Sequence, residues 1–394
     1  MKKIISVLTA TRAEYGLLYP IIQKLNTVNT FDVRIVVTGM HLSADFGLTY
    51  QDIEADNLKI DQKIEILSAS DTPAAVSRSM GQAMIGFGEY FEQLKPDLLV
   101  VLGDRYETLA VCCAAINARI PIAHLYGGET TEGAVDESIR HAITKMSYLH
   151  FTSTEEYRRR VIQLGEAPER VFCVGAIGIE NIKNTKLLTK SELELSLNRK
   201  MERPFALVTF HPVTLEENHV KEQFGELLSA LDRHRELDYI ITKANSDVNG
   251  RVINEMIDQY ASDHQNVMAF HSLGMLRYLS AMKYSSMVIG NSSSGLLEAP
   301  SFGIPTINIG DRQKGRLQSD SVINCRPEVA DIERAITSAL SKEIQNKAKN
   351  TRNPYGDGNT SDKIIRALED VICNQTIELK KRFYDVDLRY EGEL

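Results

Sequence analysis

Cysteine is scarce in this sequence, and the five cysteines present include no Cys-x-x-Cys pair. An odd number of cysteines without such pairs argues against a disulfide framework and favours a reducing, cytoplasmic compartment. The histidines and acids also lack the spacings of common metal sites, so we expect no metal. Long apolar runs are missing as well: none approaches the roughly 20 residues that span a bilayer, and the apolar stretch near the start is too short for a signal peptide.

Basic residues are not in excess either, since the formal net charge is −8. A chain with so little positive charge to neutralise phosphates is not expected to bind nucleic acid. Two phosphate-binding signatures are also absent: no GxGxxG and no GxxxxGK[ST] joins a predicted strand to a predicted helix. These absences disfavour a dinucleotide fold of the usual NAD type and a P-loop, and we expect no cofactor.

What the sequence does have is an alternation of apolar runs and amphipathic helical patterns along almost its whole length. The run Leu98–Leu102 is typical of a central strand in a parallel sheet. The pattern predicts an α/β protein, and 394 residues favour two domains. We expect two Rossmann-like, doubly wound domains, at about residues 1–180 and 181–375, with the ligand in the cleft between them. A last helical pattern, about Asp362–Phe383, could pack on either domain.

Polar residues gather where the predicted strands end, which is the edge at which open α/β sheets bind ligands. In the first half these residues are Arg12, His41, Asp104, Arg105 and Glu129, with Asp136 just beyond. In the second half they are His211, Asn245, His271, Ser292, Ser293 and Arg312. A single polar residue at a strand end is usually a helix cap, but so many at one edge indicate a site.

Three of these residues have the chemistry of proton transfer. Asp104 follows five apolar residues and a glycine, so burial could raise its pKa toward neutrality; the alternative is that it only caps the next helix. Glu129 follows two glycines, which permit a ligand to approach the backbone closely. His211 lies between Phe210 and Pro212 at a strand end, where an imidazole could hold a phosphate or move a proton.

The stretch 286–316 combines a short strand, a turn of small residues and a helix start. In the turn, Gly290–Gly295, backbone N–H groups and serine hydroxyls would converge on one point, which favours an anion such as phosphate. An ordinary strand-to-helix turn with serine and asparagine caps is the plainer alternative. Glu298 one turn later and Arg312 at the next strand end favour the phosphate site.

With these motifs the chain resembles the hydrolysing UDP-N-acetylglucosamine 2-epimerases of bacterial sialic-acid pathways, which are related to the epimerase half of a bifunctional animal enzyme. The segments that carry the resemblance occur in the same order, and they are Thr11–Gly16, Val37–His41, Leu102–Glu107, His124–Glu129, Asp136–Lys145, Phe210–Thr214, Gly290–Gly295 and Asn308–Arg316. The resemblance implies a GT-B-like fold, with a C-terminal helix at about 376–394 that packs back on the first domain. It also implies a homodimer.

The resemblance further implies a UDP-sugar site. In the second half it assigns the diphosphate to Ser292 and Ser293, the ribose to Glu298, further nucleotide contacts to Arg312, His211 and Asn245, and the uracil region to His271, Leu273 and Tyr278. From the first half Arg12 and Arg105 would contact the phosphates, while Asp104 and Asp136 match acids that the family uses for proton transfer. Tyr126 stands where the animal enzyme has a second acid, so either Tyr126 or Glu129 would take that role.

The implied reaction converts UDP-N-acetylglucosamine and water to N-acetylmannosamine and UDP through 2-acetamidoglucal. UDP-N,N′-diacetylbacillosamine is an alternative substrate. A GT-B glycosyltransferase that needs an acceptor, and an inactive sugar-nucleotide sensor, are alternatives of other classes.

Overall fold

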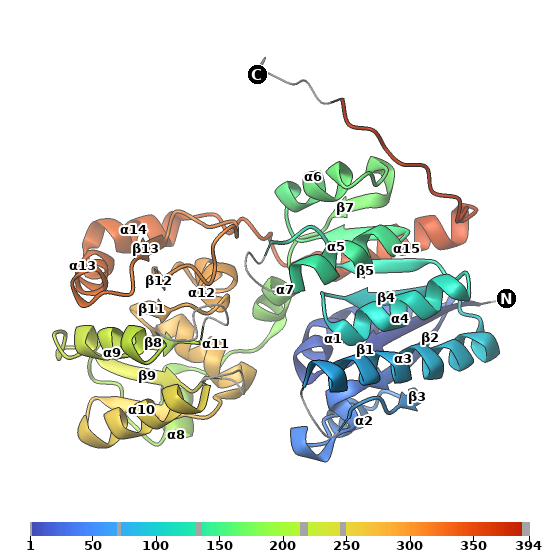
Figure 1. The fold of residues 1–394 in the computed structure, drawn as a ribbon. Helices are drawn as coiled ribbons and strands as arrows, with labels where there is room; N and C mark the ends of the chain where they lie inside the picture. Colours follow the sequence, from blue (N-terminus) through green and yellow to red (C-terminus); the bar gives the residue numbers. More distant parts are fainter. Residues whose placement is uncertain (1, 69–71, 131–135, 213–219, 245–249, 388–394) are drawn as a thin grey trace. The chain divides into compact units, whose positions relative to one another are not determined.

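The computed structural model describes residues 2–68, 72–130, 136–212, 220–244 and 250–387, which form two compact units (Figure 1). The first unit takes in the chain up to Glu129, the segment that ends at Asn181, and the chain from Gly356 onward. The second unit contains Ile182–Tyr355. The cleft expected between two domains stays a prediction.

The first unit is built on a seven-stranded parallel sheet. Its strands, in spatial order, are β3 (Ile60–Ile64), β2 (Phe31–Thr38), β1 (Lys3–Thr9), β4 (Leu98–Leu102), β5 (Ile122–Leu125), β6 (Leu149–Thr152) and β7 (Val171–Cys173). Its helices are α1 (Arg12–Thr27), α2 (Tyr50–Ala55), α3 (Pro73–Leu94), α4 (Tyr106–Asn117), α5 (Asp136–Met146), α6 (Glu155–Gln163), α7 (Ile177–Asn184, whose last residues fall in the second unit) and α15 (Thr360–Asn374).

Strand β4 shows why this sheet is covered on both faces. Leu98, Val100 and Leu102 pack into one apolar cluster, whereas Leu99 and Val101 pack into another. Successive side chains of a strand point to opposite faces, so a strand that is apolar at every position needs a layer of helices on each side. The continuous run Leu98–Leu102 therefore fixes a central position for β4 in the sheet.

The second unit repeats this architecture on a six-stranded parallel sheet. Its strands, in spatial order, are β10 (Val267–Phe270), β9 (Asp238–Thr242), β8 (Phe205–Thr209), β11 (Met287–Gly290), β12 (Thr306–Ile309) and β13 (Val322–Cys325). Its helices are α8 (Lys190–Leu197), α9 (Val220–Leu231), α10 (Gly250–Asp263), α11 (Gly274–Tyr284), α12 (Ser294–Leu297), α13 (Val329–Leu340) and α14 (Lys342–Asn350). The prediction of two parallel-sheet α/β domains is confirmed.

The helix that returns to the first unit lies earlier in the chain than expected. It is α15, which ends at Asn374, and in the expected range of about 376–394 the described residues carry no helix. The physical reason is the apolar stripe, which runs at helical spacing only from Ile364 to Ile372. Helix α15 packs its stripe against α1, and Lys24 of α1 forms a salt bridge with Asp362 at 2.7 Å.

Candidate active site

The first half of the candidate site lies where the first sheet changes direction. Strands β1 and β4 are neighbours, and the chain runs outward from them to opposite edges of the sheet. Arg12 begins the helix after β1, and Asp104 and Arg105 follow β4. A parallel sheet brings these strand ends to one edge, and such a switch point is the usual ligand position in doubly wound folds.

Asp104 does not cap helix α4 in this structure. It forms a salt bridge with Arg140, a residue 36 positions later on α5. The Asp104 side chain is 27% exposed and the Arg140 side chain only 4%, so the carboxylate faces solvent while the guanidinium lies behind it. The expected carboxylate at the edge of the sheet thus has a counter-charge, Arg140, that the sequence analysis did not identify.

Arg140 holds several acidic segments together. Its Nη1 donates to the carbonyl oxygen of Glu129 and to Oε2 of Glu137, each at 2.8 Å. Because a guanidinium has five donors in a fixed planar geometry, one buried arginine can fix several acceptors at once. The name "Arg140 cluster" is used below for Asp104, Glu129, Asp136, Glu137 and Arg140.

Asp136 is the first residue of α5 and is exposed. Even so, desolvation by the surrounding protein and then the negative charge of Asp104 raise the pKa of the Asp136 carboxyl. A carboxyl group with a raised pKa can act as a proton donor closer to neutral pH.

Glu129 is buried, and its Oε1 accepts a hydrogen bond from Ser153 Oγ at 2.8 Å. The glycines before it lie close to two helices. A Cβ on Gly128, which has φ +78°, would lie 2.4 Å from the carbonyl oxygen of Tyr157, and a Cβ on Gly127 would lie 3.0 Å from Thr144 Oγ1. These glycines let the chain pass close to α6 and α5, and a close approach of a ligand to this backbone stays a prediction.

Tyr126 has a structural contact. Its hydroxyl accepts a hydrogen bond from the backbone N–H of Ile177, the first residue of α7, at 2.8 Å. Of the two residues considered for a second acid, Glu129 is the one whose carboxyl group lies in contact with Ser153 and whose backbone contacts Arg140. We therefore keep Glu129 as the candidate.

Arg105 is held by an acid that the sequence did not single out. Its Nε donates to Oε1 of Glu107, a fully buried carboxylate, at 2.7 Å. Glu14 lies near both residues, and its pKa is raised to about 7, mainly by burial. The Arg105 charge lowers this pKa and the Glu107 charge raises it, and both effects are smaller than that of burial. The guanidinium therefore balances two acids at the ends of β1 and β4, and its orientation is fixed before any ligand arrives.

In the second unit, the turn after β11 has the compact form that the sequence suggested. Gly290 has φ +134°, and a Cβ there would lie 1.9 Å from the carbonyl oxygen of Thr209, so only glycine lets β11 end this close to β8. Ser292 and Ser293 follow in the turn, and Ser294 contacts the hydroxyl of Tyr278 at 2.5 Å. The serines thus lie beside the tyrosine that was predicted near the base.

Glu298 is a carboxylate in an unfavourable environment. Desolvation by burial raises the pKa of Glu298 to about 7. The pKa of Tyr278 is raised to about 12, mainly by its own burial and secondly by the negative charge of Glu298. No charge from the described residues opposes the shift of Glu298, and a carboxylate partly removed from water in this way destabilises the protein unless a ligand uses it. This is the pattern expected of a group that receives ligand hydroxyls.

Two of the remaining predicted nucleotide residues, His211 and Arg312, contact Asn291. The backbone of His211 exchanges two hydrogen bonds with the Asn291 side chain, at 2.7 and 2.8 Å, and Arg312 Nη1 donates to the Asn291 carbonyl at 3.1 Å. Leu273 is buried at the start of α11, while His271 is exposed and contacts Lys243 Nζ at 3.3 Å. Asn245 lies outside the described residues.

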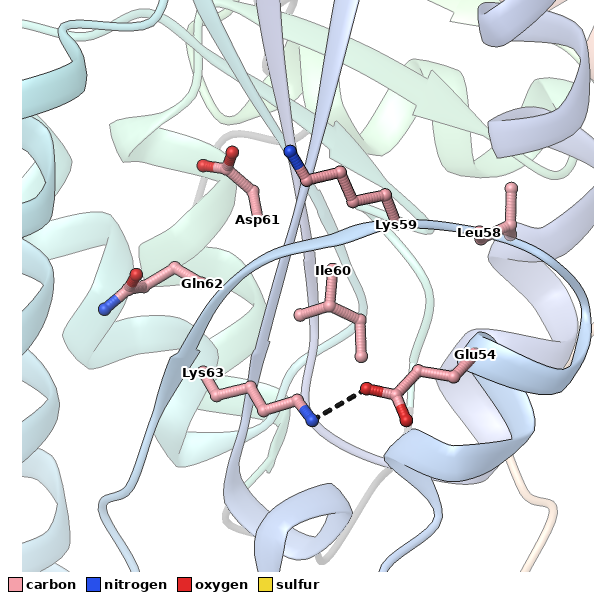
Figure 2. Close-up of a pocket in the computed structure, with 7 residues that line it drawn as sticks. All are labelled: Glu54, Leu58, Lys59, Ile60, Asp61, Gln62 and Lys63. Atoms are coloured by element: carbon pink, nitrogen blue, oxygen red, sulfur yellow. Dashed lines mark hydrogen bonds and ion pairs between the residues drawn. The ribbon is translucent and has the colours of Figure 1, made fainter.

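A separate hollow of about 650 Å³ lies on the edge strand β3, away from all these groups. It is lined by Glu54 and the segment 58–63, and Lys63 pairs with Glu54 at 2.8 Å, as Figure 2 shows. None of its lining residues is a predicted site residue, and charged side chains on an edge strand commonly prevent pairing with other chains.

Two alternating α/β units, each built on a parallel sheet, define a GT-B-like fold. The sequence profile of the UDP-N-acetylglucosamine 2-epimerase family matches residues 23–369, and the chain belongs to this family. The resemblance drawn from the motifs is thereby confirmed.

Individual relatives agree with this assignment. The chain is 43% identical over 386 residues to the GDP/UDP-N,N′-diacetylbacillosamine 2-epimerase (hydrolyzing) of Campylobacter jejuni, covering 98% of this chain and 100% of the relative. It is 40% identical to polysialic acid biosynthesis protein P7 of Escherichia coli, covering 98% of each. The crystal structure of the UDP-GlcNAc 2-epimerase of Neisseria meningitidis bound to UDP-GlcNAc has a similar fold, with a TM-score of 0.78 at 22% identity over 93% of this chain and 99% of that one.

Within the described ranges, no helix combines the length and the apolar character needed to cross a bilayer.

Proposed function

We propose that this protein is a hydrolysing 2-epimerase of a UDP-linked 2-acetamido sugar. The substrate proposed from the motifs is UDP-N-acetylglucosamine, which would give N-acetylmannosamine and UDP as a first step of sialic-acid biosynthesis. The observation that carries the proposal is the Arg140 cluster, in which Asp104, Glu129 and Asp136 come to one edge of the first sheet. Membership of the epimerase family and the Campylobacter jejuni relative support the same reaction class, and the name of the Escherichia coli relative agrees with a role in sialic-acid biosynthesis.

The second unit would hold the nucleotide. Ser292, Ser293 and Arg312 would bind the diphosphate, and the hydroxyls of the ribose would donate to Glu298. His211 and Asn245 would add contacts, with the uracil near His271, Leu273 and Tyr278. Charge developing on the departing UDP would be stabilised by these donors together with Arg12 and Arg105, which is the main electrostatic contribution to the first step.

The acids of the Arg140 cluster would then move protons at C2. Cleavage of the C1–O bond gives C1 oxocarbenium character, which makes the C2 proton acidic enough for a carboxylate to remove. The product is 2-acetamidoglucal. Water adds at C1 while a proton returns to C2 from the opposite face, which inverts C2 and releases the free sugar. Asp136, with its raised pKa, is suited to donate the returning proton, and Asp104 or Glu129 to remove the first.

A solvent-isotope experiment tests this reaction. Incubation with the UDP-sugar in D₂O, followed by proton and phosphorus NMR, is expected to show UDP release without an acceptor and one deuterium at C2 of the free sugar. Sugar release without deuterium would exclude the elimination route. UDP release only when an acceptor is added would indicate a glycosyltransferase, and tight UDP binding without any turnover would indicate a sensor.

UDP-N,N′-diacetylbacillosamine is the second candidate substrate. It is favoured by the 43% identity to the Campylobacter jejuni enzyme, whose name specifies that sugar. It differs from UDP-N-acetylglucosamine at two positions: an acetamido group replaces the C4 hydroxyl, and a methyl group replaces the hydroxymethyl group on C5. The reaction at C1 and C2 would be the same.

The raised pKa of Glu298 gives a prediction in which stability and binding change in opposite directions. Between pH 4.5 and about 7, Glu298 is ionised in the unfolded chain but still protonated in the folded protein. The free energy of unfolding therefore falls as the pH rises through this window. Glu298→Gln should therefore raise the free energy of unfolding at pH 8 by about 2–3 kcal/mol and change little at pH 4. UDP affinity should fall about 10- to 100-fold, because hydrogen bonds to a charged group are lost.

Thermal melts at the two pH values and calorimetric titration with UDP measure these effects. The exposed Glu343→Gln is the matched control and should change neither. Equal melting of Glu298→Gln and the parent protein at pH 8, together with unchanged UDP affinity, would remove Glu298 from the nucleotide site.

We also propose a cytoplasmic homodimer. Support comes from apolar side chains exposed on the neighbouring helices α3 and α4: Ile85 is 67%, Ile116 46% and Met84 41% exposed. Water contact with such side chains is unfavourable, and a partner would relieve it. Sedimentation of Ile85→Glu should then show a monomer where the parent protein is a dimer.

A further inference from the structure

A hollow of about 680 Å³ opens on the first unit beside the Arg140 cluster, and it is called the Met40 pocket here. Its walls come from the segments that follow β2 and β3, from α3, and from the residues after β4. Its apolar lining includes Met40, Leu42, Phe46, Leu67, Val76 and Tyr106. Its volume falls within the roughly 300–1,000 Å³ of small-molecule sites.

The wall after β2 is held in place from within. His41 is fully buried, and its two ring nitrogens contact Thr9 Oγ1 at 3.0 Å and Thr49 Oγ1 at 2.8 Å. Gly39 has φ +58°, and a Cβ there would lie 3.2 Å from the Ala10 carbonyl oxygen, so the segment packs tightly on the end of β1. The pocket is therefore preformed rather than created by a ligand.

Several of the polar groups around the pocket are already engaged. Ser79 Oγ donates to Ser68 Oγ at 3.4 Å and accepts from the Ser68 backbone at 3.2 Å. Arg105 is paired with Glu107, and Glu65 is exposed to solvent. Phe46, by contrast, is 44% exposed, which leaves an aromatic face without cover. The lining thus combines an apolar side, which includes Leu42 and Phe46, with a polar side at Glu65.

The pocket begins one residue away from a proposed catalytic acid. Arg105 lines it, and Arg105 directly follows Asp104. If C1 and C2 of the sugar react at Asp104, the substituents at C4 and C5 lie across the ring and need a neighbouring space. We propose that the Met40 pocket receives these substituents and selects a 4-acetamido-6-deoxy sugar over a 4,6-diol. This inference rests on the reaction class of the proposed function, and between its two candidate substrates it favours UDP-N,N′-diacetylbacillosamine over the UDP-N-acetylglucosamine proposed from the motifs.

The chemistry of the two candidates explains the selection. A C5 methyl group and the methyl of a 4-acetamido group gain from contact with Leu42 and Phe46. Hydroxyls at C4 and C6 would lose water against the apolar side formed by Leu42 and Phe46, which is costly for a polar group. One methyl in a hydrophobic pocket changes kcat/KM by about 10- to 200-fold, so a preference of at least about 10-fold for UDP-N,N′-diacetylbacillosamine is expected.

UDP release with each of the two sugar nucleotides tests the inference. Leu42→Asn and Phe46→Asn should each lower kcat/KM for UDP-N,N′-diacetylbacillosamine by about 10-fold or more, while kcat/KM for UDP-N-acetylglucosamine stays within about 2-fold. Phe46 is partly exposed, so its replacement is compatible with folding, and unchanged UDP affinity and thermal melting verify this. Leu195→Asn, at an 83% exposed position on α8, is the matched control and should alter neither substrate.

The outcomes distinguish a failure of the pocket to select the sugar from a failure of the proposed reaction. If the parent protein uses UDP-N-acetylglucosamine equally well or better, or if both Asn variants lower the two kcat/KM values in parallel, the pocket does not select the sugar. If the parent protein releases UDP from neither compound, the proposed reaction itself is wrong.

Discussion

Asp104→Asn is expected to lower turnover by about 10²- to 10⁴-fold, the usual contribution of a positioned general acid or base. Asparagine keeps the size of the side chain and can still accept a hydrogen bond from Arg140, but it cannot take a proton. UDP binding should change by less than about 3-fold, because the proposed nucleotide residues other than Arg12 and Arg105 belong to the second unit. Steady-state UDP release and calorimetric UDP titration measure the two effects separately.

Asp61→Asn provides the matched control for Asp104→Asn. Asp61 is also an aspartate in a salt bridge, with Arg34 at 2.8 Å, and it lines the hollow on β3 in Figure 2. Its replacement should leave turnover near that of the parent protein. Turnover of Asp104→Asn within about 3-fold of the parent value would exclude Asp104 from proton transfer, because even a modest general base contributes more.

Glu166→Gln is expected to cost about 3 kcal/mol of stability at pH 7. Glu166 is buried and receives Lys145 Nζ at 2.6 Å, Lys381 Nζ at 2.7 Å and His150 Nε2 at 3.1 Å. Burial alone would raise its pKa, but these partners outweigh burial and lower the pKa of Glu166 to about 2. Glutamine would leave the two ammonium groups without their counter-charge.

The pH dependence gives the sign of this effect. A depressed pKa adds stability above the unfolded value of 4.5, and that stability is lost as the pH falls toward 2. The difference between Glu166→Gln and the parent protein should therefore shrink as denaturant titrations move from pH 7 toward pH 3. Glu156→Gln, which breaks an exposed pair with Arg160, should cost no more than about 0.5 kcal/mol. An equally small cost for Glu166→Gln would contradict the proposed role of the buried pairs.

The parallel architecture could be predicted because it depends on local patterns. Strands such as Leu98–Leu102 are apolar at every position, and the polar residues after them follow from the chain order alone. Boundaries were harder where the pattern is mixed. The apolar pattern of the sequence favours a strand at about Lys63–Leu67, whereas β3 spans Ile60–Ile64, because its edge position tolerates the polar residues Asp61 and Gln62.

The partners of the site residues could not be predicted, because they depend on contacts between distant segments. Arg140 meets Asp104 across 36 positions, and Ser153 meets Glu129 across 24. The sequence does contain an indication that Arg140 is paired. Arg140 lies on the same helical face as the buried Ile143 and Thr144, where a charged side chain needs a partner. Glu107 is similar, since it is an acid within an otherwise apolar helix.

The late position of helix α15 in the chain affects how the first unit folds during synthesis. It contacts α1 and shares an apolar cluster with Leu18, Ile21 and Leu25 of that helix, although more than 330 positions separate the two helices. At roughly 5–20 residues per second, the ribosome needs about 10–40 s to proceed from Asn181 to Asn374. Throughout this interval the apolar face of α1 lacks its cover, so the nascent first unit depends on the second being synthesised. A chain that stalls before Gly356 would expose this face and be a substrate for chaperones or proteases.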